Sequence, residues 1–184
     1  MQAMALLQEN NYTIEDINDL PEGQRAELID GKMYAMSSPG SQHQRISRVL
    51  LNEISYYIAR KGGPCEPYHA PFSVFLNADN RNYVEPDISV ICDPSKINGD
   101  GCVGAPDWII EIVSPGSRQM DYSIKLFKYR NAGVREYWIV DWDKKRVLVY
   151  YFENDEIQEY GFSDRVKVNI YEDLFIDLSK ILPI

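Results

Sequence analysis

The residues most able to carry chemistry in this sequence are two acids in apolar surroundings. Glu111 interrupts the run 107–113, which is otherwise almost unbroken in its apolar character, as in a central strand buried on both faces. An ionised carboxylate in such a strand is costly unless it is paired, neutralised or bound to a metal ion. Asp87 follows a proline at the start of a second apolar segment, where a carboxylate can point into a cleft.

A predicted helix after Glu111 supplies a cation for these acids. Asp121, Lys125 and Tyr129 recur every four residues and so share one helix face. Because the helix begins where the Glu111 strand ends, its basic first turns can overhang the carboxylate, and Asp87, Glu111 and Lys125 can then converge. The plainer interpretation is an ordinary Asp–Lys helix pair beside a strand-end carboxylate that has a local base as its partner.

The cysteines and histidines do not indicate a thiol or zinc centre. Cys65, Cys92 and Cys102 are odd in number and lack a C-x-x-C spacing, so we interpret them as small core residues in a reducing cytoplasm. His43 and His69 alone do not make a zinc site. His43 lies near the start of a predicted helix, where it would cap the helix, be partly buried or touch a substrate.

The N-terminal part is predicted to form a short helix and a hairpin. A capping pattern predicts a helix over 13–20. Two short apolar runs around Asp30-Gly31 predict a hairpin over 27–36, because Asp-Gly is the strongest short hairpin signal. Glu27 lies on the first strand of this hairpin.

The remaining elements alternate between strands and helices. A strand, a helix and a strand within 107–141 form a βαβ crossover, so the two strands are expected to be parallel. The elements expected before residue 142 are a long amphipathic helix over 41–59, strands at 72–76 and 88–92, an exposed loop over 95–106, a strand over 107–113, a helix over 118–131 and a strand over 136–141. The elements expected afterwards are meander strands at 146–152, 156–160 and 166–168 and a helix near 172–180.

Length and composition predict a single domain. The chain has 184 residues, of which 45% are apolar and 26% charged, and this excludes disordered and fibrous classes. We expect one domain over 1–184, with a core over about 25–142, a helix over 13–20 and a meander over 146–184. The sequence has no basic leader and no run of about 18 apolar residues, which predicts a soluble cytoplasmic protein without a membrane partner.

Charge is the unusual feature of the composition. The formal net charge is −9 and the sequence pI is about 4.7, which argues against a partner held only by bulk attraction, such as nucleic acid. The acids concentrate toward both ends, whereas residues 118–146 hold eight bases and four acids. The predicted helix that carries Lys125 lies in this cationic stretch.

In their order along the chain, these residues resemble the PD-(D/E)XK nuclease superfamily, which has the restriction-endonuclease-like fold. More narrowly, the chain is similar to a large bacterial family named putative restriction endonucleases. The resemblance covers about residues 25–142 and rests on the ordered set of motifs. The motifs are Glu27-Leu28-Ile29-Asp30-Gly31, Ser38-Pro39-Gly40-Ser41-Gln42-His43, Pro86-Asp87, Glu111-Ile112-Val113-Ser114-Pro115, Asp121-x-x-x-Lys125-x-x-x-Tyr129 and Gly133-Val134-Arg135-Glu136-Tyr137-Trp138-Ile139-Val140-Asp141.

The resemblance implies a fold class and a kind of site. The fold is α/β (α+β), a restriction-endonuclease-like mixed β-sheet flanked by helices, with the N-terminal hairpin and the C-terminal antiparallel meander added to it. The site is that of a divalent-metal phosphodiesterase, in which Asp87 and Glu111 bind Mg²⁺ or Mn²⁺ and Glu27 is an additional acid. Such cations prefer oxygen ligands and retain water.

The catalytic lysine departs from the superfamily pattern. The usual lysine lies two residues after the glutamate, and here that position is Val113. The resemblance implies that Lys125 on the following helix replaces this lysine as the catalytic cation, and Lys128 is the second candidate for that role. Asp121 is expected to orient Lys125, and His43 is a candidate for substrate contact.

Three functions stay open from the sequence. The leading hypothesis is a metal-dependent endonuclease that acts on DNA. The alternative is a catalytically degenerate module of the same fold that binds nucleic acid or protein, which Val113 and the net charge of −9 favour. The third is a hydrolase of a small phosphodiester, which suits an acidic surface. Trp138, Trp142 and the aromatic run at 150–152 suggest a homodimer, and the alternative is that these aromatic residues belong to a buried meander.

Overall fold

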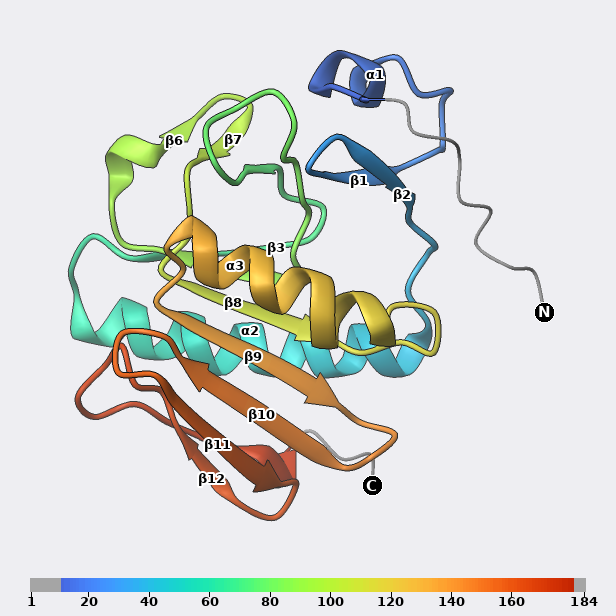
Figure 1. Ribbon diagram of the computed structural model, residues 1–184. Coiled ribbons are helices and arrows are strands. Elements are labelled where there is room, and N and C mark those ends of the chain that lie inside the picture. The colour runs from blue at the N-terminus through green and yellow to red at the C-terminus, as the bar shows by residue number, and fades with distance from the viewer. Residues whose placement is uncertain (1–10, 181–184) are drawn as a thin grey trace.

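A computed structural model describes residues 11–180, and at its centre lies a six-stranded mixed sheet. The strand order is β11-β10-β9-β8-β5-β3 (Figure 1). Neighbouring strands are antiparallel except β8 and β9, which run parallel. The predicted mixed sheet and its parallel pair are therefore confirmed. The six strands are β3 (Glu66–His69), β5 (Ile88–Ile91), β8 (Trp108–Ile112), β9 (Glu136–Asp141), β10 (Arg146–Tyr151) and β11 (Glu156–Gly161).

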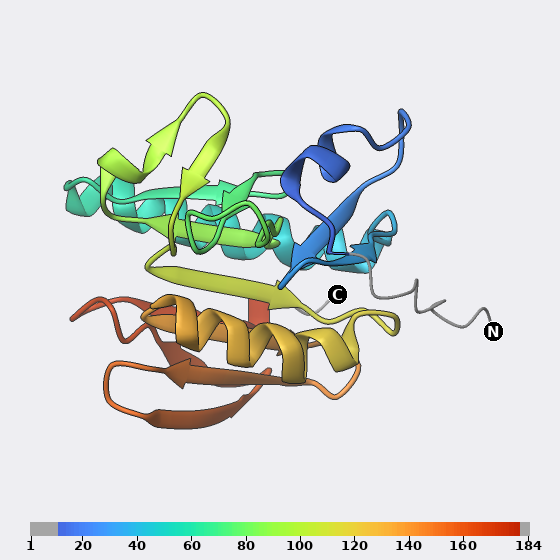
Figure 2. The same cartoon turned by 45° about the horizontal axis from the view of Figure 1, so that its top comes forward.

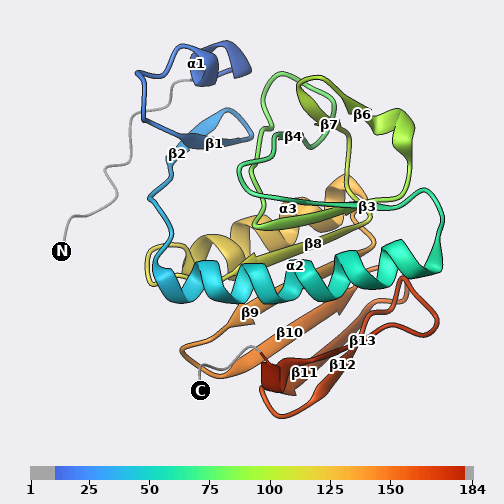
Figure 3. The same cartoon turned by 180° about the vertical axis from the view of Figure 1, so that it is seen from behind.

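Helices cover both faces of this sheet. α2 (Ser41–Lys61) crosses one face and α3 (Leu126–Ala132) lies over the other, as views from opposite sides show (Figure 1, Figure 3). Beneath α2, apolar side chains pack against Trp108 and Trp138, whose rings meet edge to face with centroids 4.9 Å apart. Every residue of β8 and β9 is buried, as expected for central strands covered on both faces.

The N-terminal hairpin forms as predicted. β1 (Ala26–Ile29) pairs with β2 (Lys32–Ala35), and Asp30 and Gly31 between them have φ of 51° and 75°. Two successive positive φ values are the requirement of the type I′ turn, which Asp-Gly meets readily. The hairpin lies close to the tip of β8 in a tilted view (Figure 2). It thereby brings Glu27 toward the end of the central strands.

The predicted helices differ in detail from those observed. The predicted helix over 41–59 is confirmed and continues to Lys61. α1 spans only Ile14–Asn18. The helix predicted over 118–131 begins with a π-helical turn, Met120–Lys125, and continues as α3. Such turns are rare and occur frequently at functional sites. In the described part of the chain, none of the helices has the length and apolar character that a membrane span requires.

The middle of the chain contains small strands where a plain loop was predicted. The prediction for 95–106 is wrong, because this segment forms a hairpin that pairs with a two-residue strand inside 72–76. Gly101 allows the pairing, since it has φ of 142° and a Cβ there would lie 2.2 Å from the carbonyl oxygen of Ser73. The elements are β4 (Val74–Phe75), a 3₁₀ turn (Pro94–Lys96), β6 (Ile97–Asn98) and β7 (Gly101–Val103).

The C-terminal part also departs from its prediction. The expected third meander strand over 166–168 belongs to a separate two-stranded sheet, and a helix near 172–180 is wrong. Leu174, Ile176 and Leu178 are all buried, and burial at every second residue is the period of a strand rather than of a helix. The elements are β12 (Arg165–Lys167), β13 (Phe175–Asp177) and a 3₁₀ turn (Leu178–Lys180).

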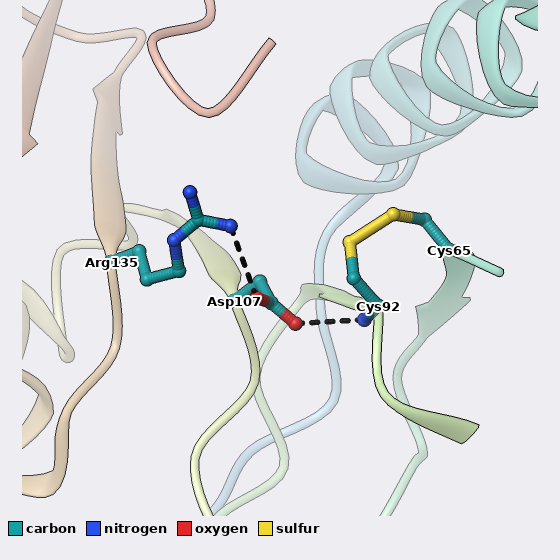
Figure 4. Close-up of a disulfide and its surroundings, with 4 residues drawn as sticks. All are labelled: Cys65, Cys92, Asp107 and Arg135. Carbon is teal, nitrogen blue, oxygen red and sulfur yellow. Dashed lines mark hydrogen bonds and ion pairs between the residues drawn. A yellow bond between two sulfur atoms is a disulfide. The ribbon is translucent and has the colours of Figure 1, made fainter. Parts of the chain in front are cut away.

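Two of the three cysteines form a disulfide, which corrects the prediction of unpaired core cysteines. Cys65 and Cys92 flank β3 and β5, whose register places them opposite each other, and their sulfur atoms are bonded. Cys102 is buried and free, as expected of a core residue. The Cys92 N–H donates to Asp107 at 2.7 Å, and Arg135 lies on the other side of this carboxylate (Figure 4). The sequence analysis did not predict β3, and only the pairing of β3 with β5 brings Cys65 and Cys92 together.

Candidate active site

The candidate site lies at the end of the sheet toward which β8 points. Glu111 is the fourth residue of β8, and Asp87 directly precedes β5. Since Ile88 pairs with Ile110 in antiparallel register, the two acids come opposite each other. The backbone N–H of Ile112 donates to Asp87 Oδ2 at 2.7 Å and fixes this carboxylate. Two acids from separate segments are thus neighbours.

Lys125 reaches the acids from the π-helical turn. Its Nζ lies 2.9 Å from Glu111 Oε1 and 2.9 Å from Glu27 Oε2. Asp121, on the same turn, has its Oδ1 4.0 Å from this ammonium. The structure therefore gathers side chains from the hairpin, the central strand and the helix around one cation. We call Glu27, Asp87, Glu111, Asp121 and Lys125 the carboxylate cluster.

The position of the usual superfamily lysine is part of the hydrophobic core. Val113 is 2% exposed and packs in the core under α3 together with Ile109 and Ile139. Ile109, Glu111 and Val113 alternate along β8 and so point to the same face. Lys125 delivers its ammonium to Glu111 from the helix above that face. The charge that a strand lysine would bring is thus supplied by another element.

Two hydroxyl groups complete the cluster, and the sequence analysis did not place them in the site. The Tyr129 hydroxyl donates to Glu111 Oε1 at 2.7 Å, and the Ser117 hydroxyl donates to Asp121 Oδ2 at 2.6 Å. The position of Tyr129 could have been predicted from the sequence, because it lies four residues after Lys125 on the same helix face. The contact of Ser117 could not have been predicted, since a serine before a helix is most often a helix cap.

His43, the candidate for substrate contact, and Lys128, the second candidate lysine, have different positions. His43 belongs to the site, because its Nε2 lies 3.0 Å from Asp87 Oδ2. Its Nδ1 is buried and has no hydrogen-bond partner within residues 11–180. Lys128 does not join the carboxylate cluster, because its ammonium pairs with Asp30 in the hairpin turn. It holds the hairpin against α3.

The site opens on the side of α2. Glu27, Glu111 and Lys125 have side chains that are only 5–6% exposed. The side chains of Asp87 and His43 are 16% and 13% exposed and form the rim. A molecule that approaches the cluster therefore meets the first turn of α2 and the segment before β5.

The cluster holds more acids than cations, and the pKa values shift accordingly. Burial raises the pKa of Glu111 well above its ordinary value; Lys125 opposes this shift, and the nearby acids Asp87, Asp121 and Glu27 add to it. Burial also raises the pKa of Asp121 to about 6. Burial alone would lower the pKa of Lys125, but the carboxylates of Glu111 and Glu27 raise it well above its ordinary value, so the ammonium stays charged.

This excess of negative charge fits a divalent cation. Asp121 Oδ1 is buried without a hydrogen-bond partner among the described residues, with Lys125 Nζ 4.0 Å away, so this oxygen can accept a further donor or cation. Within residues 11–180, no group of three or more His, Cys, Asp or Glu is arranged to hold a metal ion. Mg²⁺ commonly takes one or two carboxylates and completes its shell with water and substrate phosphates. Asp87 and Glu111 fit such a two-carboxylate arrangement.

Comparison with known proteins identifies the fold and then the family. A crystal structure titled as a "putative nuclease belonging to DUF820" from Anabaena variabilis matches with a TM-score of 0.75 and 23% identity, over 92% of this chain and 96% of the other. The mixed sheet with its flanking helices is therefore a fold shared with that protein, and the predicted mixed α/β architecture is confirmed.

The sequence matches extend over most of the chain. The uncharacterised protein slr1290 of Synechocystis is 26% identical over 153 residues, which cover 79% of this chain and 77% of the relative. Residues 14–183 match the model of the Uma2 family, described as "putative restriction endonuclease". The chain belongs to this family, and the resemblance drawn from its motifs is confirmed.

Proposed function

We propose that this protein is a nuclease that hydrolyses phosphodiester bonds with Mg²⁺ or Mn²⁺, and that its substrate is DNA. The observation that carries the proposal is the geometry around Lys125, whose Nζ lies 2.9 Å from both Glu111 and Glu27 at a rim that carries Asp87. Buried charges in excess of their partners lower stability, so they indicate a functional site. Membership of the Uma2 family supports nuclease chemistry there.

The acids would divide the work of holding a metal ion. Asp87 and Glu111 would bind it, and Glu27 would act mainly by holding the ammonium of Lys125. A bound Mg²⁺ or Mn²⁺ supplies positive charge against the phosphate and makes a bound water more acidic. His43 orients Asp87 through its Nε2, which lies 3.0 Å from the carboxylate. Outer partners of this kind fix the direction of a ligand's lone pairs.

Lys125 would act as a fixed cation. Its pKa is raised by Glu111 and Glu27, so it does not serve as a proton acceptor near neutral pH. An ammonium in a site that excludes water stabilises negative charge that develops on phosphoryl oxygens far better than it would in bulk water. Tyr129, whose hydroxyl donates to Glu111, keeps that carboxylate in place.

Hydrolysis assays test this proposal. The purified protein is incubated with Mg²⁺, Mn²⁺ or EDTA and with plasmid DNA, single-stranded DNA, RNA or bis(p-nitrophenyl) phosphate. We expect metal-dependent hydrolysis that Asp87→Asn and Glu111→Gln each reduce by at least about 10³-fold, which is about 4 kcal/mol of barrier. Glu156→Gln, at an exposed position of β11, is the matched control and should retain activity.

The outcomes separate a nuclease from a non-catalytic member of the fold. A wild-type protein that hydrolyses none of these substrates, while a control nuclease does, would contradict the proposal and favour a binding module. Hydrolysis that survives Asp87→Asn would place the chemistry elsewhere.

A further inference from the structure

A groove runs along the N-terminal half of α2, next to the rim of the carboxylate cluster. Its volume is about 480 Å³. α2 and the edge strand β3 lie side by side in two views (Figure 1, Figure 3). The polar residues that line the groove are Ser41, Gln44, Arg45, Ser47, Arg48 and His69.

The groove begins where the candidate site opens. His69 pairs with Ile88 across β3 and β5, and the next residue, Ala70, donates its N–H to the carbonyl oxygen of Asp87 at 3.1 Å. His43, the other rim residue, lies on the first turn of α2 between lining residues of the groove. A linear molecule with one phosphate at Asp87 can therefore continue along α2.

Arg45 and Arg48 are exposed and form no ion pair, hydrogen bond or ring contact within residues 11–180. Every other arginine of this range contacts an oxygen acceptor or an aromatic ring through its guanidinium. No acid occurs in the sequence from residue 31 to residue 52. The groove is thus a local cationic surface whose two guanidinium groups are free to bind a ligand.

The cationic stretch over 118–146 does not offer such a surface. Its arginines and lysines on the helix are engaged with acids of this chain. The pairs are Arg118 with Asp141, Lys125 with Glu111, Lys128 with Asp30 and Arg130 with Asp155. The bases on the helix are therefore paired with acids of this chain, Lys144 and Lys145 are exposed in the turn after β9, and the two unpaired guanidinium groups of residues 11–180 lie on α2.

We infer that this groove binds the sugar-phosphate backbone of a polynucleotide on one side of the bond to be hydrolysed, with Arg45 and Arg48 as the phosphate ligands. The inference rests on the proposed function and names its substrate as a chain of nucleotides longer than a dinucleotide. Arginine and uncharged polar side chains are the usual donors to phosphate oxygens. In a protein of net charge −9, a local cationic groove offsets the general repulsion of a polyanion.

The test measures binding without catalysis. Fluorescence anisotropy of a labelled 20-nucleotide single strand and of the corresponding duplex is recorded in EDTA at several salt concentrations. The variant Arg45→Gln/Arg48→Gln is compared with Arg60→Gln/Lys61→Gln, which removes the same charge from the other end of α2. We expect the first pair to weaken binding at least tenfold and to reduce the salt slope by about 2, and the second pair to change affinity less than twofold.

Each outcome decides the inference. Equal losses in the two double variants would show that binding follows total charge, and the groove would be the wrong surface. Absence of wild-type binding to both oligonucleotides, or binding that survives Arg45→Gln/Arg48→Gln, would also overturn it. Thermal melts verify that both variants fold. Wild-type hydrolysis of bis(p-nitrophenyl) phosphate with Mn²⁺ is measured separately, so failure of the nuclease proposal is distinguishable from failure of the groove.

Discussion

β8 and β9 carry acids at both of their ends, and the two sets of acids have different partners. At the N-terminal ends, Asp107 accepts from the Cys92 N–H and from Arg135 (Figure 4). Glu136, which is fully buried, accepts hydrogen bonds from three groups. The donors to Glu136 are the Trp138 ring, the Asn169 amide and the Ile170 N–H.

At the other end, the carboxylate cluster has one lysine among four acids. Lys125 serves Glu111 and Glu27 at once, and Asp121 Oδ1 has no hydrogen-bond partner in residues 11–180. The comparison teaches how to separate structural from functional acids in this fold. Glu136 has three donors of its own, whereas Glu111 and Glu27 share one ammonium and Asp121 Oδ1 has no donor among the described residues, so the cluster can accept a further cation.

Removal of Lys125 should give the largest change in stability. Lys125→Met leaves Glu27 and Glu111 buried without their cation, and breaking such a pair costs about 3–5 kcal/mol. Arg135→Met is the matched change at the opposite end, where the guanidinium is 37% exposed and its ion pairs contribute about 0–1 kcal/mol. Urea unfolding in EDTA measures both. Equal losses in the free energy of unfolding for the two variants would contradict the difference proposed between the acids at the two ends of β8 and β9.

Glu136 should make stability depend on pH in a way that the exposed acids do not. Burial raises its pKa from 4.5 to about 7, so the folded protein holds a proton that the unfolded chain releases between these values. The stabilisation is therefore present below pH 4.5 and is lost as the pH rises through 7. From pH 5 to pH 8, the free energy of unfolding should fall by about 2 kcal/mol more in the wild type than in Glu136→Gln.

Urea titrations at several pH values measure this difference. Glu156→Gln, on the exposed part of β11, is the control and should follow the wild type. Parallel pH profiles for the wild type and Glu136→Gln would show that Glu136 is ionised throughout this range.

His43 should give a smaller effect, confined to the functional end. His43→Ala removes the partner of Asp87, and loss of an outer partner typically reduces metal affinity or activity by about 10–100-fold. We expect about a tenfold loss of hydrolysis, with partial recovery in His43→Gln, which retains a donor. Glu156→Gln, at an exposed position of β11 far from Asp87 in the sheet order, is the control. An unchanged rate of hydrolysis in His43→Ala would show that the His43 side chain only packs against its neighbours.

The parts of the fold that local signals specify could be predicted from the sequence. Asp30-Gly31 gave the hairpin, and the apolar runs around Glu111 and in 136–141 gave the parallel pair. Lys125 could be placed near Glu111, because one short crossover connects the strand to the helix. These relations depend on neighbours along the chain.

The remaining contacts depend on how distant segments pack, and no local pattern encodes that. β3 was missed because it is short, contains Pro67 and is only partly buried, and the Cys65–Cys92 pairing was lost with it. The contact of His43 with Asp87 joins residues that are 44 positions apart. Trp142, which suggested a dimer surface, packs instead against the core under α2, and the homodimer stays a prediction.

The most direct test of the central claim is a titration with Mn²⁺ followed by electron paramagnetic resonance of the free ion. Wild-type protein, Asp87→Asn and Glu136→Gln are compared at pH 8, so that an acid is removed from each end of the sheet in turn. We predict specific Mn²⁺ binding in the wild type and in Glu136→Gln, and its loss in Asp87→Asn. Equal Mn²⁺ binding by Asp87→Asn and the wild type, or none in the wild type, would contradict the assignment of the carboxylate cluster as a metal site.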